Sequence, residues 1–305
     1  MKIGKTSFAA QIEKNLLLCS EIGTHALDNV NVIPIMKWKD VKDVLRQLRD
    51  PKARELYNTI TFDTITLFIP MIEKFVCARE GVGNIKEIPY GQGWNMVAQE
   101  LQETLREITM LSFGLILIAH SKEKATNKLD NEGNPIMSVT PDIGNKKISQ
   151  VCSAVTDLIA YIGVDFDKEG NPTRYLYTRQ TPTVFAGSRW RYLDPIIPFG
   201  YHELVEAISN AIEKQKNLDG AVVVEHQEQK QMVARPFADI MKEARELWES
   251  YFDAVSTDEE KEQRFVLIKD ILRKVFGNED FKLSTAVPSQ ADLVELFIDE
   301  MKDIM

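Results

Sequence analysis

The tetrapeptide Gly4-Lys5-Thr6-Ser7 constrains the fold of this chain more than any other feature. It matches the end of the pattern G-x-x-x-x-G-K-[ST], in which backbone N–H groups surround phosphates and a lysine reaches the terminal ones. A short helix is predicted to begin at Thr6, and the N–H groups of its first turn would face the bound anion. The predicted phosphate site comprises Lys2, Ile3, Gly4, Lys5, Thr6 and Ser7.

The pattern is incomplete in the printed chain. Counting back from Gly4 places its first glycine two residues before Met1, and the strand that normally feeds such a loop is not there either. We therefore expect Met1 to be an internal methionine of a longer protein. The missing strand is predicted to lie in the middle of the sheet, between Leu115–Ala119 and Leu158–Val164.

Apolar runs alternate with amphipathic segments over the first two thirds of the chain. The runs Asn15–Ser20, Tyr57–Asp63 and Phe113–Ala119 predict strands. Continuous apolar strands separated by helices are typical of a parallel sheet buried on both faces, so the predicted class is α/β with helices on both faces. The helices are expected at 6–14, 40–48, 65–79, 94–111, 148–155 and 201–216.

The segment that follows the third strand is polar. Ser121–Lys147 is predicted to be a long loop, which inside a compact domain is usually functional. Leu158–Val164 is expected to be a further strand. The run VDFDKEGNPTRYLYTRQ, with alternating residues on either side of a Lys-Glu-Gly-Asn turn, predicts a hairpin.

Charge and composition divide the chain into three parts. Residues 1–216 are the predicted nucleotide-binding core, 217–235 a polar linker, and 236–305 an acidic helical domain with helices near 236–254, 258–276 and 289–304. Residues 201–305 carry a net charge of −10 and residues 1–200 a net charge of +1, within a total of −9. A nearly neutral core remains compatible with binding a phosphate backbone.

The sequence indicates a soluble cytoplasmic protein. No apolar run approaches the roughly 20 residues that span a bilayer, and no signal peptide is evident, so no membrane partner is expected. Cys19, Cys77 and Cys152 are widely spaced and form no C-x-x-C pair. We expect them to be reduced, buried thiols.

Three polar residues at predicted strand ends suggest hydrolytic chemistry. Asp63 ends an apolar strand 57 residues after Thr6, where its carboxylate could meet a magnesium ion held by the Thr6 hydroxyl; the alternative is a helix N-cap. Glu21 could polarise an attacking water, or could be a solvated loop acid. His120 could sense the ligand at the carboxyl end of a central strand, or could be structural.

Two segments are candidates for binding nucleic acid. The predicted loop carries Lys122, Lys124, Lys128, Lys146 and Lys147 against four acids, so a solvated loop remains the alternative. Between Arg174 and Asp194, four arginines are interleaved with Tyr175, Tyr177, Trp190 and Tyr192 and face one acid. Such arginines can stack on bases, contact the nucleotide of a neighbouring subunit, or pack on aromatic rings of their own surface.

The order of these motifs resembles a known family. GKTSFA, LLLCSE, TITFDTIT, LILIAHSKEK and RYLYTRQTPTVFAGSRWRYL are similar to segments of phage-encoded P-loop nucleotide-binding proteins with a RecA-like core. Some of these proteins are single-strand DNA annealing proteins or minimal recombinases. The resemblance covers residues 1–210 and does not extend to 236–305.

The resemblance implies a role for each candidate residue. Lys5 and Thr6 would bind phosphate and magnesium, Asp63 would be the Walker B acid, Glu21 the catalytic carboxylate and His120 the sensor. RecA itself has a glutamine-type sensor, so the histidine is a departure. Arg179 or Arg189 would reach ATP across a subunit interface. The implied DNA-binding residues are Lys122, Lys124, Lys146, Lys147 and Arg174.

The function expected from this resemblance is ATP hydrolysis coupled to single-stranded DNA in phage recombination, annealing or replication. Its cofactors would be ATP and Mg²⁺. It would work as an oligomeric ring or filament in the bacterial host cytoplasm, with a single-strand binding protein as a further candidate partner. A helicase-type motor of DNA replication and a nucleotide-binding module without turnover are the alternatives.

Overall fold

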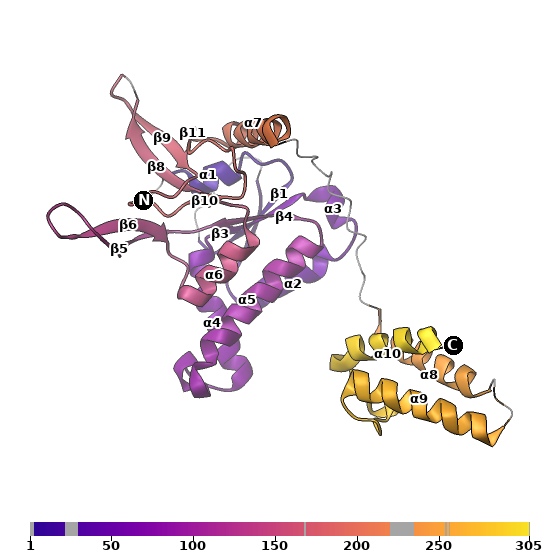
Figure 1. The fold of residues 1–305 in the computed structure, drawn as a ribbon. Coiled ribbons are helices and arrows are strands. Elements are labelled where there is room, and N and C mark those ends of the chain that lie inside the picture. The colour runs from indigo at the N-terminus through magenta and orange to yellow at the C-terminus, as the bar shows by residue number, and fades with distance from the viewer. Residues whose placement is uncertain are drawn as a thin grey trace. The chain divides into compact units, whose positions relative to one another are not determined.

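The computed structural model describes residues 3–21, 30–167, 169–219, 235–253, 255 and 257–304. The chain divides into two compact units, Met1–Gln227 and Glu228–Met305. We call them the N-terminal and the C-terminal unit (Figure 1).

A four-stranded parallel sheet forms the centre of the N-terminal unit. Its strand order is β2-β1-β3-β4, and the strands are β1 (Asn15–Cys19), β2 (Asn31–Pro34), β3 (Thr59–Asp63) and β4 (Gly114–Ile118). Cys19 pairs with both Pro34 and Asp63, and Asp63 also pairs with Ile118, so the carboxyl ends of all four strands are level. The residues that follow these strands therefore meet at one edge of the sheet.

The two faces of the sheet are covered by different helices. Because side chains alternate along a strand, Leu16, Leu18, Ile60 and Phe62 share one face. They pack there against α2 (Trp38–Leu48), α4 (Ile65–Glu80) and α5 (Gly93–Met110). On the other face, Leu17 and Ile118 pack with Ala9 of the short helix α1 (Lys5–Ala9). The predicted α/β class, with helices on both faces of a parallel sheet, is confirmed.

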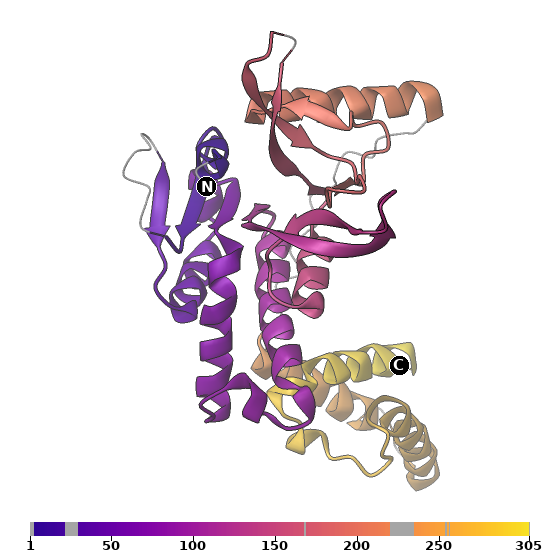
Figure 2. The ribbon, with the colours of Figure 1, turned by 90° about the vertical axis from the view of Figure 1, so that its left-hand side faces the viewer.

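Two further helices, α3 (Ala53–Leu56) and α6 (Lys146–Val155), belong to this part of the unit. The helices α4 and α5 run alongside each other (Figure 2), α6 packs on α5, and α3 precedes β3. The link between α4 and α5 contains the short 3₁₀ turns Ile85–Glu87 and Pro89–Gly91. The sequence did not predict β2, a four-residue strand whose residues are exposed or only half-buried.

The prediction of a long loop at Ser121–Lys147 is wrong. It contains the antiparallel strands β5 (Ser121–Leu129) and β6 (Pro135–Pro141), and its end is the first turn of α6. The Asp130 side chain closes the turn by accepting hydrogen bonds from the backbone N–H groups of Glu132 and Asn134, at 2.9 and 2.8 Å. Nearly every side chain of β5 is exposed, so polar composition here marks a solvated hairpin rather than an irregular loop.

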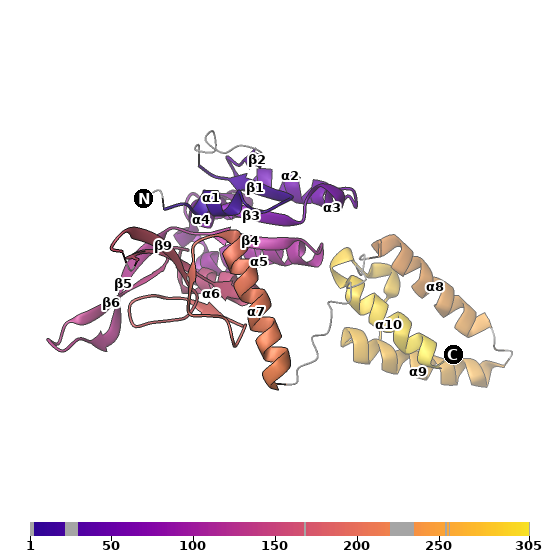
Figure 3. The ribbon, with the colours of Figure 1, turned by 90° about the horizontal axis from the view of Figure 1, so that it is seen from above.

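The predicted hairpin is confirmed, although the strand predicted before it is not continuous. Strands β8 (Tyr161–Phe166) and β9 (Pro172–Tyr177) pair antiparallel, and β11 (Ile196–Pro198) adds to β9. Leu158–Val164 is split between β8 and β7 (Leu158–Ile159), which pairs with β10 (Gly187–Ser188) in another sheet. This segment lies outside the four-stranded parallel sheet, and the expected strand between it and β4 stays a prediction. Both hairpins, β5–β6 and β8–β9, project from the same side of the unit (Figures 1 and 3).

The helix α7 (Tyr201–Asp219) is the last described element of the N-terminal unit. It packs against β11 through a cluster that includes Leu176, Leu193, Ile197 and Ala211 (Figure 3). It extends three residues beyond the predicted end at 216. Most of the predicted linker, residues 220–234, lies outside the described residues.

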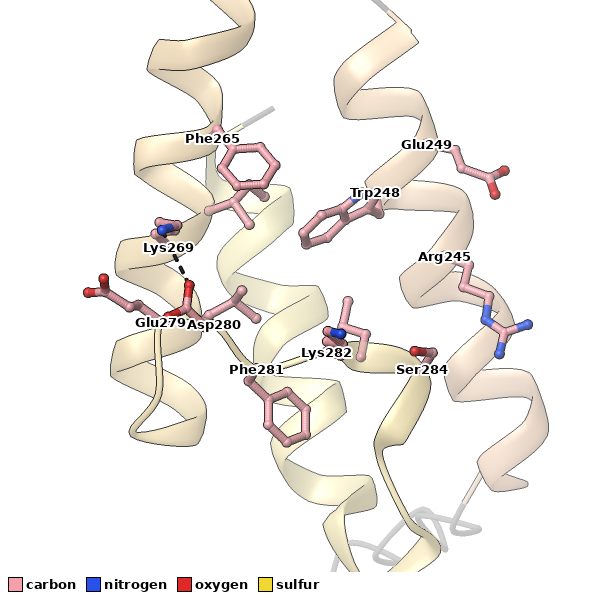
Figure 4. A pocket seen from close by; sticks show the side chains of 13 residues that line it. Arg245, Trp248, Glu249, Phe265, Lys269, Glu279, Asp280, Phe281, Lys282 and Ser284 are labelled. Carbon is pink, nitrogen blue, oxygen red and sulfur yellow. Dashed lines mark ion pairs between the residues drawn. The ribbon is translucent and has the colours of Figure 1, made fainter.

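The C-terminal unit contains the three predicted helices, α8 (Phe237–Asp253), α9 (Asp258–Phe276) and α10 (Ala291–Ile304). Phe297 and Met301 of α10 are fully buried against the other two helices. The backbone of Gly277 has φ 72° and ends α9, a conformation that favours glycine. Two 3₁₀ turns, Leu283–Thr285 and Pro288–Gln290, lead into α10. Figure 4 shows an apolar groove in this unit, with Trp248 and Phe265 facing each other across it.

The described helices include none that is long and apolar enough to cross a membrane. Cys19, Cys77 and Cys152 are buried free thiols, as the sequence predicted. Burial raises the pKa of the Cys152 thiol to about 12.

Candidate nucleotide-binding site

The site is built at the carboxyl edge of the parallel sheet. Asp63 is the last residue of β3, and Thr6 lies in the first turn of α1. The Thr6 hydroxyl Oγ1 donates a hydrogen bond of 2.6 Å to Asp63 Oδ2, and the Asp63 residue is only 7% exposed. The structure thus joins the two residues that the sequence predicted as magnesium ligands, although they are 57 positions apart.

The surroundings of Asp63 act on the pKa of its carboxyl group in opposite directions. Burial is the main cause that raises the pKa of its carboxyl group, and the nearby Glu21 carboxylate raises it further. The hydrogen bond from Thr6 and the charges of Lys5 and His120 act in the opposite direction. A hydroxyl and a carboxylate are oxygen ligands that Mg²⁺ accepts, and a bound cation would reverse the effect of burial. The two side chains therefore fit a magnesium ion.

A second pair of side chains lies beside Asp63. Glu21 follows β1 and His120 follows β4, the two strands that flank β3. Glu21 Oε1 is 3.2 Å from His120 Nε2, and Thr64 Oγ1 donates a hydrogen bond of 3.3 Å to the same oxygen. Half of the Glu21 side chain and 41% of the His120 side chain remain exposed. The predicted catalytic acid and the predicted sensor thus contact each other at a solvent-accessible point.

The loop before α1 contains Gly4 in a backbone conformation that favours glycine. Gly4 has φ 102°, which side chains rarely allow, and its carbonyl oxygen accepts a 2.9 Å hydrogen bond from the N–H of Phe8. Lys5 is the first helical residue, so the N–H groups of Lys5, Thr6 and Ser7 have no acceptor within the helix. Lys2 of the predicted phosphate site lies outside the described residues. Ile3 and Ser7 are placed on either side of these residues, and Ser7 is exposed.

Hydrogen bonds connect this edge to the β5–β6 hairpin. The backbone N–H of His120 donates to Thr66 Oγ1 at 3.0 Å, and that hydroxyl donates to the carbonyl of Asp142 at 2.8 Å. The N–H of Asp142 donates to the carbonyl of His120 at 2.7 Å, and its carboxylate pairs with Lys122 at 2.7 Å. The base of the hairpin is therefore held directly on the predicted sensor.

The lysines predicted to bind DNA fall into two groups. Lys122 and Lys124 lie on one face of β5, opposite Thr140 and Ser138 of β6. Lys146 and Lys147 form the first turn of α6, and both are exposed. The ammonium group of Lys147 also donates a hydrogen bond to the side chain of Asn95. All four lysines therefore belong to regular structure rather than to a loop.

Arg179 and Arg189, the predicted intersubunit arginines, are bound within their own chain. The Arg179 guanidinium donates hydrogen bonds to the backbone carbonyls of Trp190 and Arg191, both at 2.6 Å. Arg189 forms a 2.7 Å ion pair with Asp157 and donates to the carbonyl of Ala154 at 2.9 Å. Both guanidinium groups thus make contacts within their own chain, and a role for either arginine at a subunit interface stays a prediction. Their spacing among aromatic residues signals packing as readily as ligand binding.

Arg174 lies next to the phosphate-binding loop. Its guanidinium donates a 3.1 Å hydrogen bond to the carbonyl of Ile3 and lies over the Phe199 ring. Its predicted role in DNA binding stays a prediction.

Sequence reasoning missed the residues that organise the site. The sequence patterns do not single out Thr64 or Thr66, whereas in the structure Thr64 contacts Glu21 and Thr66 joins His120 to Asp142. Ser20 was also missed; its hydroxyl accepts the N–H of Thr64 at 3.0 Å. The repeated threonines in TITFDTIT are the only signal in the sequence, because their partners come from distant segments.

Comparison with known proteins agrees with this geometry. The family described as "AAA domain" matches residues 1–190, which are more than half of the chain. The chain belongs to the AAA domain family. As a P-loop NTPase family, it accounts for the four-stranded parallel sheet and for the loop that precedes α1. All the described candidate residues, from Ile3 to Arg189, lie within the matched part of this AAA domain.

A curated relative matches nearly the whole chain. It is the "SPbeta prophage-derived uncharacterized protein YorG" of Bacillus subtilis (strain 168), 28% identical over 313 residues. The match covers 99% of this chain and 90% of the relative. The similarity therefore includes the C-terminal helical unit as well as the AAA domain. A prophage-derived relative and a P-loop domain together support a phage-type P-loop ATPase.

Proposed function

We propose that this AAA domain protein binds and hydrolyses ATP and couples hydrolysis to single-stranded DNA. The observation that carries the proposal is the meeting of two pairs, Thr6 with Asp63 and Glu21 with His120, at one edge of the sheet beside the phosphate-binding loop. A hydroxyl–carboxylate pair and an exposed carboxylate next to a polar partner are the groups that phosphoryl transfer to water requires.

The roles of the residues follow from their positions. Lys5 and the N–H groups at the start of α1 bind the terminal phosphates, while Thr6 and Asp63 hold Mg²⁺. The metal ion, when bound, neutralises charge that develops on the phosphate oxygens. Glu21 accepts a proton from the attacking water, and its exposed carboxylate is free to reach that water. His120 orients Glu21 through their 3.2 Å contact.

The β5–β6 hairpin is the proposed DNA-binding element. Lys122 and Lys124 are exposed on one face of the hairpin, beside the half-buried Thr140, and exposed ammonium groups suit phosphates. Lys122 is also paired with Asp142, whose backbone is bonded to that of His120. A phosphate that draws Lys122 away from Asp142 would alter the support of the sensor. Binding of DNA is therefore expected to change the rate of ATP hydrolysis.

The biological setting belongs to the same proposal. The prophage origin of the relative supports a role in phage recombination, annealing or replication, in the host cytoplasm. An oligomeric ring or filament is the form in which such an enzyme would act on a strand. Its partners would be single-stranded DNA, further copies of itself and a single-strand binding protein.

Phosphate release with and without a single-stranded oligonucleotide tests this proposal. We expect Mg²⁺-dependent release by the wild-type protein, a change in rate on adding DNA, and loss of both nucleotide binding and release in Lys5→Ala. Nucleotide binding without release would favour a module without turnover. Unwinding of a forked duplex, in place of annealing of complementary strands, would favour a helicase.

A further inference from the structure

Arg174 reaches the phosphate-binding loop from a distant part of the chain. It lies on β9, 171 residues after Ile3, and its Nη1 donates a 3.1 Å hydrogen bond to the Ile3 carbonyl. The guanidinium carbon is 4.5 Å from the centre of the Phe199 ring. Phe199 in turn donates its backbone N–H to the carbonyl of Arg174 at 3.1 Å. This backbone hydrogen bond therefore keeps the Arg174 guanidinium and the Phe199 ring next to each other.

The guanidinium covers the glycine of the loop. A Cβ atom placed on Gly4 would overlap Arg174 Nη1 and would lie 3.2 Å from the Phe199 ring. A side chain at this position would therefore have to displace the guanidinium, and the φ of 102° already favours glycine. The loop backbone thus runs in close contact with Arg174.

Two further contacts hold α1 to the same part of the fold. The Phe8 ring packs 5.8 Å from the Phe199 ring, and the N–H of Tyr201 donates a 2.8 Å hydrogen bond to Gln11 Oε1. Because the loop and the end of α1 are both anchored, Arg174 acts on a segment that is otherwise fixed.

We propose that Arg174 is a positioning residue for the phosphate-binding loop and acts within its own subunit. The inference rests on the proposed function, in which this loop binds nucleotide. A charged donor forms a stronger hydrogen bond than a neutral one, and stacking on Phe199 restricts the rotamers of Arg174. Holding the Ile3 carbonyl sets the orientation of the following peptides, so that their N–H groups are aligned before the phosphates arrive. Preorganisation of this kind increases affinity by lowering the ordering cost of binding.

The test separates affinity from chemistry. In Arg174→Ala, the Kd and KM for ATP should rise about tenfold, the usual effect of losing a hydrogen bond to a charged group. The kcat at saturating ATP should stay within about twofold, because Lys5, Thr6, Asp63 and Glu21 are unchanged. Arg174→Lys keeps the charge and loses the planar stacking, so an intermediate Kd is expected.

A matched control and a readout without nucleotide make the outcome specific. Arg191→Ala removes another exposed arginine of the same region, which packs over Tyr192 at 5.4 Å, and should leave the Kd for ATP unchanged. In nucleotide-free protein, the amides of residues 4–9 should exchange faster in Arg174→Ala than in wild type or Arg191→Ala. Unchanged exchange and unchanged Kd would overturn the assignment of Arg174. Faster exchange in a protein whose wild type releases no phosphate would support the assignment and refute the proposed function instead.

Discussion

Removing the hydroxyl of Thr6 should destabilise the N-terminal unit even in the absence of nucleotide. Thr6→Val keeps the shape of the side chain but removes the donor that lies 2.6 Å from Asp63. Asp63 is 7% exposed, so its carboxylate has little water to replace that donor. Hydrogen bonds to charged groups contribute about 1.5–3 kcal/mol, and the partial exposure of Thr6 favours the lower end of this range. We therefore expect a loss of about 1–2 kcal/mol in the free energy of unfolding at pH 7.

The measurement has to report on the N-terminal unit alone. Three of the four tryptophans, Trp38, Trp94 and Trp190, lie in that unit, so a Trp248→Phe background confines tryptophan fluorescence to it. Urea unfolding followed by fluorescence then gives the loss for Thr6→Val. Thr6→Ser is the matched control, because it keeps the hydroxyl and should lose less than Thr6→Val.

A double-mutant cycle decides whether the loss comes from the Thr6–Asp63 bond. In an Asp63→Asn background, Thr6→Val should cost clearly less than in the wild type, since the charged acceptor is gone. Equal costs in the two backgrounds, or a Thr6→Val variant as stable as wild type, would refute the argument that Thr6 stabilises a buried carboxylate.

Further predictions concern pH and DNA. Because burial raises the pKa of Asp63, its contribution to stability is present at low pH and is lost as pH rises through the folded-state pKa. Asp63→Asn should therefore raise the Tm of the nucleotide-free protein at pH 7, and the gain should vanish below about pH 4, as thermal unfolding over that range would show. Alanine at both Lys122 and Lys124 should weaken oligonucleotide binding and reduce its salt dependence by about one to two phosphate contacts in titrations at several salt concentrations; an unchanged slope would remove the hairpin from the DNA path. If the acidic C-terminal helices compete with DNA, deleting 236–305 should tighten binding most at low salt, where the Debye length is about 30 Å rather than 8 Å.

Local sequence patterns predicted the sheet and its helices well. The strands β1, β3 and β4 are recognisable as continuous apolar runs. β1 and β3 are buried on both faces, whereas β4 lies at the edge of the sheet and is mostly half-buried. Three amphipathic segments predicted the helices of the C-terminal unit, and the charge of −10 over residues 201–305 marked this part of the chain as acidic. At the site, strand ends were sufficient to select Glu21, Asp63 and His120, because parallel strands bring such positions to one edge.

What the sequence did not predict depends on distant partners. Nothing near Arg174 indicates that its guanidinium meets Ile3, since that contact requires β9 to lie beside the loop. The same applies to Arg179, whose carbonyl partners belong to a later turn. The β5–β6 hairpin was missed because neither of its strands is mainly buried, so burial left no period-two pattern in the residues.

The most direct test of the account is the comparison of wild type with Glu21→Gln in ATP binding and steady-state hydrolysis in the presence of Mg²⁺. The substitution keeps the size of the side chain and a hydrogen-bonding oxygen, but removes the base that would accept a proton from water. We predict an ATP Kd close to that of wild type and a turnover slower by about 10²-fold or more, the usual effect of losing a general base. Equal turnover in the two proteins would contradict the assignment of Glu21, and absence of Mg²⁺-dependent hydrolysis in the wild type would contradict the account of this edge of the sheet as an ATPase site.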